Sequence, residues 1–325
     1  MKKQTKIAAV LSAAAFMMMV SGLPVYAASY GWVTEGDAKV YYDEDGYLTT
    51  DAWRKRGEDW FYLGEDGQIV KNAKIDEYYV DDEGKMVTNA WVELKNEEDP
   101  DSPETPDTFW YYFEKDGKSA VSKWVKFDSK WYYFDESGHM ATGKTEIDGA
   151  TYYLGTEKDG FMRTGWIRLE ENSHAPGASE SWYYFNSDGK MVTTQYDKKI
   201  DGSYYTFIDG KMQTGWVLMP SKSDVTDSNA ASPKITDYQY YGAAGDGKRA
   251  EGFRSIEGIS GIHAADEVYT FYFKAGKPYV SDKKGNSLFT INAKKYAFSD
   301  LGIMQTGRQI ANVANDEIAN FYFGE

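Results

Sequence analysis

Cysteine is absent from this chain, and histidine occurs only three times, at His139, His174 and His263. Without cysteine the protein has no disulfides, no thiolate metal ligands and no cysteine nucleophile. The three histidines fall in different parts of the sequence, which argues against a clustered zinc site. A G-x-S-x-G nucleophile motif is also missing. We therefore predict a protein that is not an enzyme and that holds no metal and no cofactor.

Positive charge is scarce as well. The chain has 36 Lys and Arg against 51 Asp and Glu, a formal net charge of -15. This balance argues against nucleic acid and anionic lipid as partners, and it is compatible with a cationic or neutral ligand. Acidic runs such as 43–45 and 81–83 lack the spacing of an EF-hand loop. We attribute them to turn chemistry and solubility.

Long apolar runs are missing except at the start, where residues 7–20 follow three lysines. That run is too short to span a bilayer comfortably. Val25-Tyr26-Ala27 fits the small-residue rule for signal cleavage. We predict a signal peptide at 1–27 and an exported mature chain, 28–325, with no membrane span and no covalent anchor. An uncleaved membrane anchor is the alternative.

Aromatic residues, by contrast, make up 16% of the chain, and residues 124–144 (WVKFDSKWYYFDESGHMATGK) show how they are arranged. An opening tryptophan and a short polar turn lead to the strand Trp131-Tyr132-Tyr133-Phe134, and a second turn ends in Gly138. The pattern predicts a β-hairpin, with Gly138 supplying the positive φ of its turn. Alternation places Trp131 and Tyr133 on one face and Tyr132 and Phe134 on the other, which we predict to be core.

The same pattern recurs along the chain. A glycine followed two residues later by methionine occurs at Gly84/Met86, Gly138/Met140, Gly160/Met162, Gly189/Met191, Gly210/Met212 and Gly302/Met304. Tryptophans open the units at Trp32, Trp53, Trp91, Trp124, Trp166 and Trp216, and open the aromatic strands at Trp60, Trp110, Trp131 and Trp182. A fixed period near ~20 residues indicates a repeat array, here of about eleven units, each contacting mainly its neighbours.

Three insertions interrupt this array, near 93–108, 170–180 and 220–237. Each falls between an opening tryptophan and its aromatic strand, so we expect exposed loops that project from one side of the stack. Beyond Phe253 the aromatic strands persist, but their tryptophans are lost.

The spaced pattern of tryptophan, aromatic run, Asp-Gly or Ser-Gly turn, methionine and Thr-Gly-Trp resembles a known family. It resembles the cell-wall-binding repeats, also called choline-binding repeats, of Gram-positive surface proteins. It is also similar to the glucan-binding repeats of glucosyltransferases and clostridial toxins. The match covers nearly the whole mature chain. The resemblance implies an all-β fold in which hairpins of ~20 residues stack as a left-handed β-solenoid. Period and spacing alone indicate the stack, whereas handedness and ligand come from the family.

The resemblance also implies binding sites between successive hairpins. A choline site in the family takes the opening and strand tryptophans of one hairpin, an aromatic residue of the next, and often a methionine, because ring faces attract a quaternary ammonium. Carried onto this chain, the sets are Trp53, Trp60, Tyr79 and Met86; Trp91, Trp110, Tyr133 and Met140; Trp124, Trp131, Tyr153 and Met162; and Trp166, Trp182, Tyr205 and Met212. Beside Trp32 and Trp216, Lys39 and Tyr240 replace the strand tryptophan. Pure packing of the rings in a solenoid is the alternative role for all these residues.

The function implied by the resemblance is noncovalent attachment of an exported, non-catalytic protein to the cell wall or surface of a Gram-positive bacterium. Choline-substituted teichoic-acid-type polymer is the implied partner. Three alternatives stay open. The repeats could bind glucan or another carbohydrate, the acidic loops could engage a protein partner in a surface adhesin or scaffold, or the chain could be the targeting part of a wall hydrolase such as an amidase.

Overall fold

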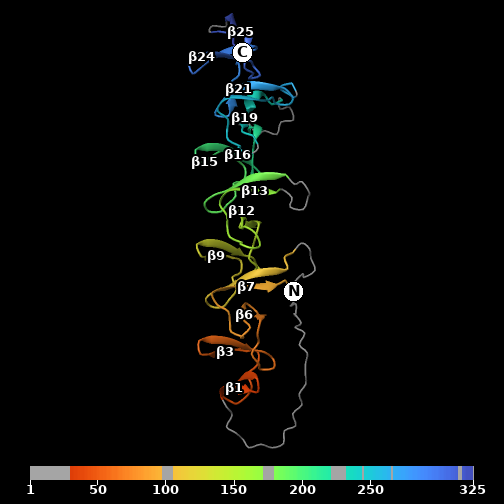
Figure 1. Cartoon of the computed structure of the whole chain (residues 1–325), viewed down its shortest axis with the longest axis vertical. Helices are drawn as coiled ribbons and strands as arrows, with labels where there is room; N and C mark the ends of the chain where they lie inside the picture. Colours follow the sequence, from red (N-terminus) through yellow and green to blue (C-terminus); the bar gives the residue numbers. More distant parts are fainter. Residues whose placement is uncertain are drawn as a thin grey trace, which may run out of the picture. The chain divides into compact units, whose positions relative to one another are not determined.

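A computed structural model of the protein describes residues 30–96, 105–170, 179–220, 232–243, 245–264, 266–313 and 317–324. Within these ranges the chain forms β-strands and one short 3-10 turn, η1 (Ile235–Asp237), without an α-helix (Figure 1). The all-β prediction is therefore confirmed for the described part. That part also contains no helix long and apolar enough to cross a membrane. The predicted signal peptide, 1–27, lies outside the described residues.

The chain divides into two compact units. The first comprises the described residues up to Lys123 together with Phe134–Met140, and the second comprises Trp124–Tyr133 and the described residues from Ala141 onward. The strands of the first unit are β1 (Gly31–Glu35), β2 (Ala38–Tyr42), β3 (Ala52–Arg56), β4 (Asp59–Leu63), β5 (Ala73–Ile75), β6 (Tyr78–Val80), β7 (Ala90–Lys95) and β8 (Thr108–Phe113). They pair in sequence order as two-stranded antiparallel hairpins. The hairpin of β9 (Lys123–Phe127) and β10 (Lys130–Phe134) lies where the division falls.

The second unit continues the same architecture. Its strands are β11 (Lys144–Ile147), β12 (Ala150–Tyr153), β13 (Gly165–Glu170), β14 (Glu180–Phe185), β15 (Gln195–Ile200), β16 (Ser203–Ile208), β17 (Lys211–Met212), β18 (Gly215–Leu218), β19 (Tyr238–Tyr241), β20 (Gly252–Glu257), β21 (Val268–Lys274), β22 (Lys277–Pro278), β23 (Asn286–Ile291), β24 (Lys294–Phe298), β25 (Gly307–Asn312) and β26 (Ile318–Phe323). Most pair as antiparallel hairpins, whereas β24-β23-β25-β26 form one four-stranded sheet with a parallel β23/β25 pair. Hairpins therefore persist beyond Phe253, in a part of the chain that has no tryptophan.

Several hairpin turns use left-handed backbone at two successive residues. Between β9 and β10 these are Asp128 (φ 45°) and Ser129 (φ 64°), and between β11 and β12 they are Asp148 (φ 51°) and Gly149 (φ 74°). Positive φ at both central residues is the type I′ geometry, whose twist matches that of the strands. The prediction that Gly138 makes the hairpin turn is thus wrong. Short polar side chains tolerate this backbone, so the first polar turn suffices.

Gly138 (φ 81°) belongs to the second turn, which follows the hairpin. There the Oδ1 atom of Asp135 accepts the backbone N–H groups of Ser137 and His139, both at 2.9 Å. The turn returns the chain so that Met140 forms a β-bridge with Phe134. The turn acids therefore satisfy their own backbone, which agrees with the turn chemistry expected for the acidic runs.

Successive hairpins are joined by a repeated backbone hydrogen bond. The N–H of Met86 donates to the carbonyl of Trp60, and that of Met162 donates to the carbonyl of Trp131, both at 2.8 Å. The methionine side chain then lies against the turn glycine of the next unit. A Cβ atom added at Gly117 would approach the Sδ atom of Met86 to 2.7 Å, a distance that forces a shift. The Gly-x-Met spacing is therefore a packing device that repeats with the hairpins.

The core lies at the ends of the second strands. The fully buried residues there are Leu63, Val80, Phe113, Phe134, Phe185, Phe207, Tyr241, Phe273 and Phe298. In β10 the predicted core residue Phe134 is buried, Tyr132 is half-buried, and Trp131 at the strand's beginning is 41% exposed. Apolar burial is thus concentrated at one end of each strand, and the strand tryptophan stays accessible to solvent at the other.

The strands that flank the three predicted insertions pair with each other. Lys95 faces Thr108, Glu170 faces Glu180, and Leu218 faces Tyr238. Each insertion therefore interrupts a hairpin between its two strands. Residues 97–104, 171–178 and 221–231 of these insertions lie outside the described residues.

Candidate functional site: an aromatic cage around Trp166

Trp166 is the centre of an aromatic cluster in the second unit. Its ring centroid lies 5.1 Å from that of Tyr184 and 6.4 Å from that of Trp182, both on the partner strand β14. The register explains this, because Trp166 faces Tyr184 directly and Trp182 is two residues away on the same face. Tyr205, on β16 of the next hairpin, approaches Trp166 to 4.8 Å. Two consecutive hairpins thus contribute rings to one cluster.

Three of these rings line an open cavity of about 290 Å³. It is lined by Trp166, Trp182, Tyr205 and Met212, and its remaining wall comes from the turn residues Gly245, Asp246 and Lys248. The structure therefore brings all four residues of the last predicted set around one space. Such a volume suits a small ligand group, and electron-rich rings with a nearby carboxylate suit a cationic one.

The rings that line the cavity differ in how deeply they are buried in the hydrophobic core. Tyr205 is 8% exposed and forms a core cluster with Val192, Ile200 and Phe207, against which Trp166 packs. Trp182 is half-buried at the rim, and its ring contacts that of Trp166 edge-on. Trp166 and Tyr205 are therefore structural as well as cavity-lining, whereas Trp182 forms an outer wall.

The polar wall of the cavity is an ion pair. The Nζ atom of Lys248 lies 3.3 Å from Oδ1 of Asp246, and both side chains are 54% exposed. A pair this open to water contributes little to stability. The pair places the carboxylate of Asp246 at the mouth of the aromatic cavity, and the ammonium of Lys248 offsets much of the charge of that carboxylate.

The first predicted set is arranged differently. Trp53 packs against Tyr62 of its own hairpin and Tyr78 of the next, both at 5.3 Å. Tyr79, the predicted partner, instead lies 5.9 Å from Phe113. Trp60 is 40% exposed.

The third predicted set shows the same shift by one residue. Trp124 packs against Tyr133 at 5.3 Å and against Tyr152 at 4.9 Å, rather than against the predicted Tyr153. Tyr153 lies 6.2 Å from Phe185. Beside the exposed Trp131, the Nζ atom of Lys126 lies 5.6 Å from the ring centroid. The chain's own cation therefore occupies one approach to this ring.

A parity rule accounts for these neighbours. Tyr78 and Tyr152 each lie two residues before a fully buried residue at or just beyond the end of their strand, Val80 or Leu154. Tyr205 stands in the same relation to Phe207. Because successive side chains point to opposite faces, the ring that meets the opening tryptophan shares the face of the buried residue. Counting back from the buried strand end was the signal in the sequence that would have identified Tyr78 and Tyr152.

In the second predicted set, Trp91 and Trp110 lie 6.5 Å apart, and Phe134 approaches Trp91 to 5.4 Å. The predicted Tyr133 belongs to the other unit. Met140 donates its backbone N–H to the carbonyl of Trp110 at 2.8 Å.

The four predicted methionines share backbone or packing roles. The side chains of Met86, Met162 and Met212 lie against the turn glycines Gly117, Gly189 and Gly247. Met212 also lines the cavity at Trp166.

The tryptophans without a strand tryptophan are held by hydrogen bonds. The indole N–H of Trp32 donates to the carbonyl of Lys55, and that of Trp216 to the carbonyl of Glu257, both at 3.0 Å. Trp216 also packs against Tyr240 at 5.2 Å. The two hydrogen bonds join each tryptophan to the next hairpin, which indicates a packing role. Among the residues described, no group of three or more His, Asp or Glu side chains is placed to hold a metal ion.

Two segments match families of wall-binding repeats. A choline-binding repeat model matches residues 121–166, and a putative cell wall binding repeat model matches residues 178–191. The first segment ends at Trp166 and the second contains Trp182, so both tryptophans of the cavity lie in matched repeats. These matches confirm the predicted kinship with choline-binding repeats. A flagellin protein model also matches residues 3–91. The described part of that segment consists of the same short hairpins as the matched repeats, so we draw no function from it.

Among proteins of known function, glucosyltransferase-S of Streptococcus mutans is 27% identical over 331 residues, covering 91% of this chain and 20% of that enzyme. The chain thus spans about a fifth of the length of the curated relatives that it matches. Two solved structures share the fold. The modular autolysin LytC of Streptococcus pneumoniae, in complex with a synthetic peptidoglycan ligand, has a TM-score of 0.51 and 21% identity, covering 85% of this chain and 52% of LytC. CbpJ of Streptococcus pneumoniae TIGR4 has a TM-score of 0.51 and 20% identity, covering 89% of this chain and 97% of CbpJ.

Proposed function

We propose that this protein, whose chain carries choline-binding repeats, attaches noncovalently to a choline-bearing, teichoic-acid-type polymer of a Gram-positive cell envelope. In this proposal the protein is exported, binds through aromatic cages between stacked hairpins of a left-handed solenoid, and catalyses no reaction. The observation that carries the proposal is the cavity of about 290 Å³ walled by Trp166, Trp182, Tyr205 and Met212. The matched repeat families and the carboxylate of Asp246 at the cavity's mouth support a quaternary ammonium as its occupant.

The energetics of such a cage explain why the hairpins are repeated. A quaternary ammonium gains about 0.5–2 kcal/mol from each ring face that it meets. Three rings therefore contribute a few kcal/mol, which corresponds to a dissociation constant on the order of millimolar. One such site would release a polymer quickly. Several sites on one polymer would retain it, because binding at one site raises the effective concentration of ligand at the next.

Chromatography of the mature chain, residues 28–325, tests this function. We expect retention on a choline-substituted resin and release by free choline. An ethanolamine-substituted resin is the matched control, because its primary ammonium carries the same charge but is more strongly hydrated and fits an aromatic cage less well. Equal retention on both resins, or retention that free choline does not reverse, would refute an aromatic choline cage.

Glucan is the second candidate ligand, for a specific reason. The glucosyltransferase relative aligns with 91% of this chain. Aromatic side chains also stack on sugar faces, and the first unit offers tyrosine-rich surroundings such as those of Trp53. Retention on dextran, with no retention on the choline resin, would support carbohydrate binding by the same hairpins.

A further inference from the structure

Two hairpins carry a lysine at the position that an opening tryptophan takes in others. Lys74 follows an Asn-Ala pair, as Trp91 does, and Lys144 follows a Thr-Gly pair, as Trp166 does. The strand register agrees with this alignment. Each of the four side chains faces the residue that immediately precedes a fully buried one on the partner strand or just beyond its end. Lys74 and Lys144 are therefore equivalent in position to the opening tryptophans.

Each lysine lies over a tyrosine ring of the next hairpin. The Nζ atom of Lys74 lies 4.6 Å from the ring centroid of Tyr111 on β8, and that of Lys144 lies 4.9 Å from the ring centroid of Tyr183 on β14. Both tyrosines stand two residues before a fully buried phenylalanine, as Tyr205 does at the cage. An ammonium within ~6 Å of a ring centroid is attracted by the ring. The ring that would bound a ligand cavity thus already has a cation over it.

The junction at Lys144 otherwise keeps the parts of the cage. A Cβ atom added at Gly210 would lie 2.8 Å from Cε of Met191 and 3.4 Å from Cδ1 of Tyr183, so these three residues are in contact. The cage also combines a tyrosine and a methionine, and that methionine packs on a turn glycine in the same way. The difference lies in the two tryptophan positions, which are held here by Lys144 and Thr151. The junction therefore resembles a cage in which a lysine replaces both the opening ring and the ligand's ammonium.

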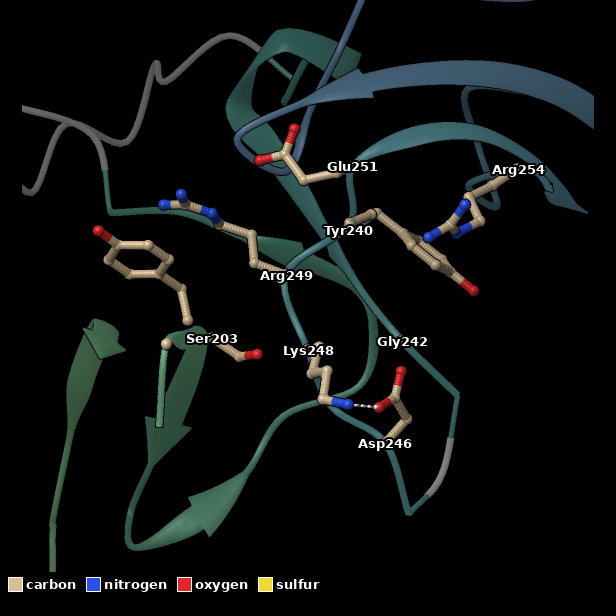
Figure 2. A pocket seen from close by; sticks show the side chains of 11 residues that line it. Ser203, Tyr240, Gly242, Asp246, Lys248, Arg249, Glu251 and Arg254 are labelled. Atoms are coloured by element: carbon tan, nitrogen blue, oxygen red, sulfur yellow. Dashed lines mark ion pairs between the residues drawn. The ribbon is translucent and has the colours of Figure 1, made fainter. Parts of the chain in front are cut away.

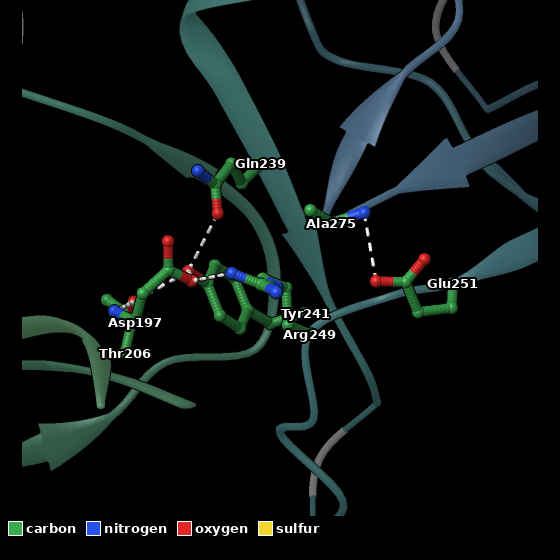
Figure 3. A network of polar contacts seen from close by, with 7 residues as sticks. All are labelled: Asp197, Thr206, Gln239, Tyr241, Arg249, Glu251 and Ala275. Atoms are coloured by element: carbon green, nitrogen blue, oxygen red, sulfur yellow. Dashed lines mark hydrogen bonds and ion pairs between the residues drawn. The ribbon is translucent and has the colours of Figure 1, made fainter. Parts of the chain in front are cut away.

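The junction that follows the cage also holds one of the chain's own cations over a ring. The guanidinium carbon of Arg249 lies 4.1 Å from the ring centroid of Tyr204, and its Nη1 atom donates to Oδ1 of Asp197 at 2.9 Å. That carboxylate also accepts the hydroxyl of Tyr241 at 3.0 Å, within a buried network (Figure 3). Figure 2 shows Arg249 at the wall of a cavity of about 330 Å³. The guanidinium over this ring is thus already paired with a carboxylate.

We propose that Lys74 and Lys144 are built-in occupants of their junctions, which consequently take no external ammonium. Tyr111 and Tyr183 are only 7% and 4% exposed, whereas both lysines are exposed and can lay their stems along the ring while the charged head stays hydrated. A cation tethered in this way is present at a high effective concentration, so a weakly bound free ammonium does not displace it. The residue that opens a hairpin therefore decides whether that junction is available to the polymer. The statement about ligand sites rests on the proposed function of the Trp166 cage, whereas the internal contact rests on the geometry alone.

The internal contact is tested without any ligand. In ¹H–¹³C NMR spectra of the mature chain, the ε-CH₂ signals of Lys74 and Lys144 should be displaced from that of the exposed Lys158 by the ring currents of the tyrosines. Lys144→Met assigns the Lys144 signal. Tyr183→Leu should return that signal to the position of Lys158 and leave the Lys74 signal displaced. The native spectrum decides by itself, because ordinary shifts for both lysines would overturn the proposal.

Choline titration of the mature chain labelled with 5-fluorotryptophan tests the closure. Choline should move the ¹⁹F signal of Trp166, which Trp166→Phe assigns, and should leave the Lys144 ε-CH₂ signal displaced. The double variant Lys144→Trp/Thr151→Trp builds both tryptophans of a cage beside Tyr183. It should gain one choline site, whose dissociation constant lies within about tenfold of that at Trp166. Lys158→Trp is the matched control, because it adds a tryptophan at an exposed turn position, and its signal should not move at the same choline concentrations.

The outcomes separate this inference from the proposed function. If choline returns the Lys144 signal to its ordinary position, the lysine is displaced by ligand, and the inference falls while the cage stands. If the two new tryptophans do not respond to choline in a chain whose Trp166 signal does, lysine is not what closes the junction, and the inference falls again. A displaced Lys144 signal in a chain whose Trp166 signal ignores choline would support the internal contact and refute the choline function.

Discussion

Replacing the two tryptophans of the cage one at a time separates binding from packing. Trp182 contacts Trp166 edge-on at the rim, whereas Trp166 also meets Tyr184, Tyr205 and Phe207 within 5.7 Å. Trp182→Ala should therefore remove one wall of the cavity and leave the core intact. Trp166→Ala should damage both.

The structure sets the expected magnitudes. Loss of one edge-on aromatic contact costs about 0.5–1.5 kcal/mol of stability. Trp166 packs against the core cluster of Tyr205 and Phe207, and its truncation should cost about 3–5 kcal/mol. For binding, one ring face is worth ~0.5–2 kcal/mol, so Trp182→Ala should raise the choline dissociation constant at this cage about two- to thirtyfold.

Two assays measure these quantities in the mature chain labelled with 5-fluorotryptophan, in which ¹⁹F NMR follows individual tryptophans. The ¹⁹F signal of Trp166 reports choline binding at the cage of the Trp182→Ala variant. Local stability is measured by urea unfolding, followed by the signal of the cage tryptophan that remains, which is Trp166 in Trp182→Ala and Trp182 in Trp166→Ala. Trp60→Ala is the matched control, because Trp60 is 40% exposed and belongs to the first unit. It should alter neither the affinity nor the stability read at Trp166.

A single result would refute the reasoning. If Trp182→Ala destabilises the Trp166 region as much as Trp166→Ala does, Trp182 is a core residue and the division into inner and outer walls is wrong. If Trp182→Ala keeps both stability and choline affinity, the cavity is not where choline binds.

Three further predictions follow from individual contacts. Lys126→Ala should strengthen choline binding at Trp131 a few-fold, measured by the Trp131 ¹⁹F signal, because it removes the ammonium that lies 5.6 Å from the ring; unchanged affinity would show that the lysine does not compete. Tyr241→Phe should lower the free energy of unfolding by about 1–3 kcal/mol in urea titrations, because it removes a hydroxyl bonded at 2.7–3.0 Å within a buried network; a neutral effect would contradict the network's role. The backbone N–H of Thr156, first among several groups, lowers the pKa of Asp159 below its ordinary 3.8. The ionised carboxylate therefore stabilises the fold at pH values above 3.8. In urea titrations the native chain should be more stable than Asp159→Asn there, and this difference in the free energy of unfolding should disappear as the pH falls through the lowered pKa of Asp159. A difference that persists in acid would argue against ionisation as its source.

Much of the fold could be predicted from the sequence because the relevant signals are local. A polar turn, an aromatic run and a turn glycine lie within one unit of about twenty residues, and each specifies its own hairpin whatever follows. Gly117 and Met86 show that even the contact between units repeats with the same spacing. The sequence did not show which of the two turns in a unit closes the hairpin. Glycine is the commoner signal for positive φ, yet Asp128 and Ser129 adopt it here.

Neighbours across hairpins were harder to predict. We predicted that Tyr79 and Tyr153 meet the opening tryptophans. The rings that do so are Tyr78 and Tyr152, each one residue earlier in the sequence. The error has a physical source, because a strand's parity is set by which of its residues is buried, and that depends on packing rather than on spacing. Tyr205 was predicted correctly as a neighbour of Trp166, since Tyr205 lies on the same face of its strand as the buried Phe207.

The sequence by itself determined that this protein is an array of aromatic hairpins, because turn residues, alternation and period act within each unit. The tertiary structure alone decided where those rings enclose space. At Trp166 the walls come from β13, β14, β16 and β17 and from the turn that carries Asp246 and Lys248, which are distant in sequence. Likewise, Arg249 is held by the carboxylate of Asp197, which comes from the irregular strand β15 of an earlier hairpin. Such enclosure depends on how the side chains of separate hairpins fill the volume between them, and no spacing within one repeat encodes that volume.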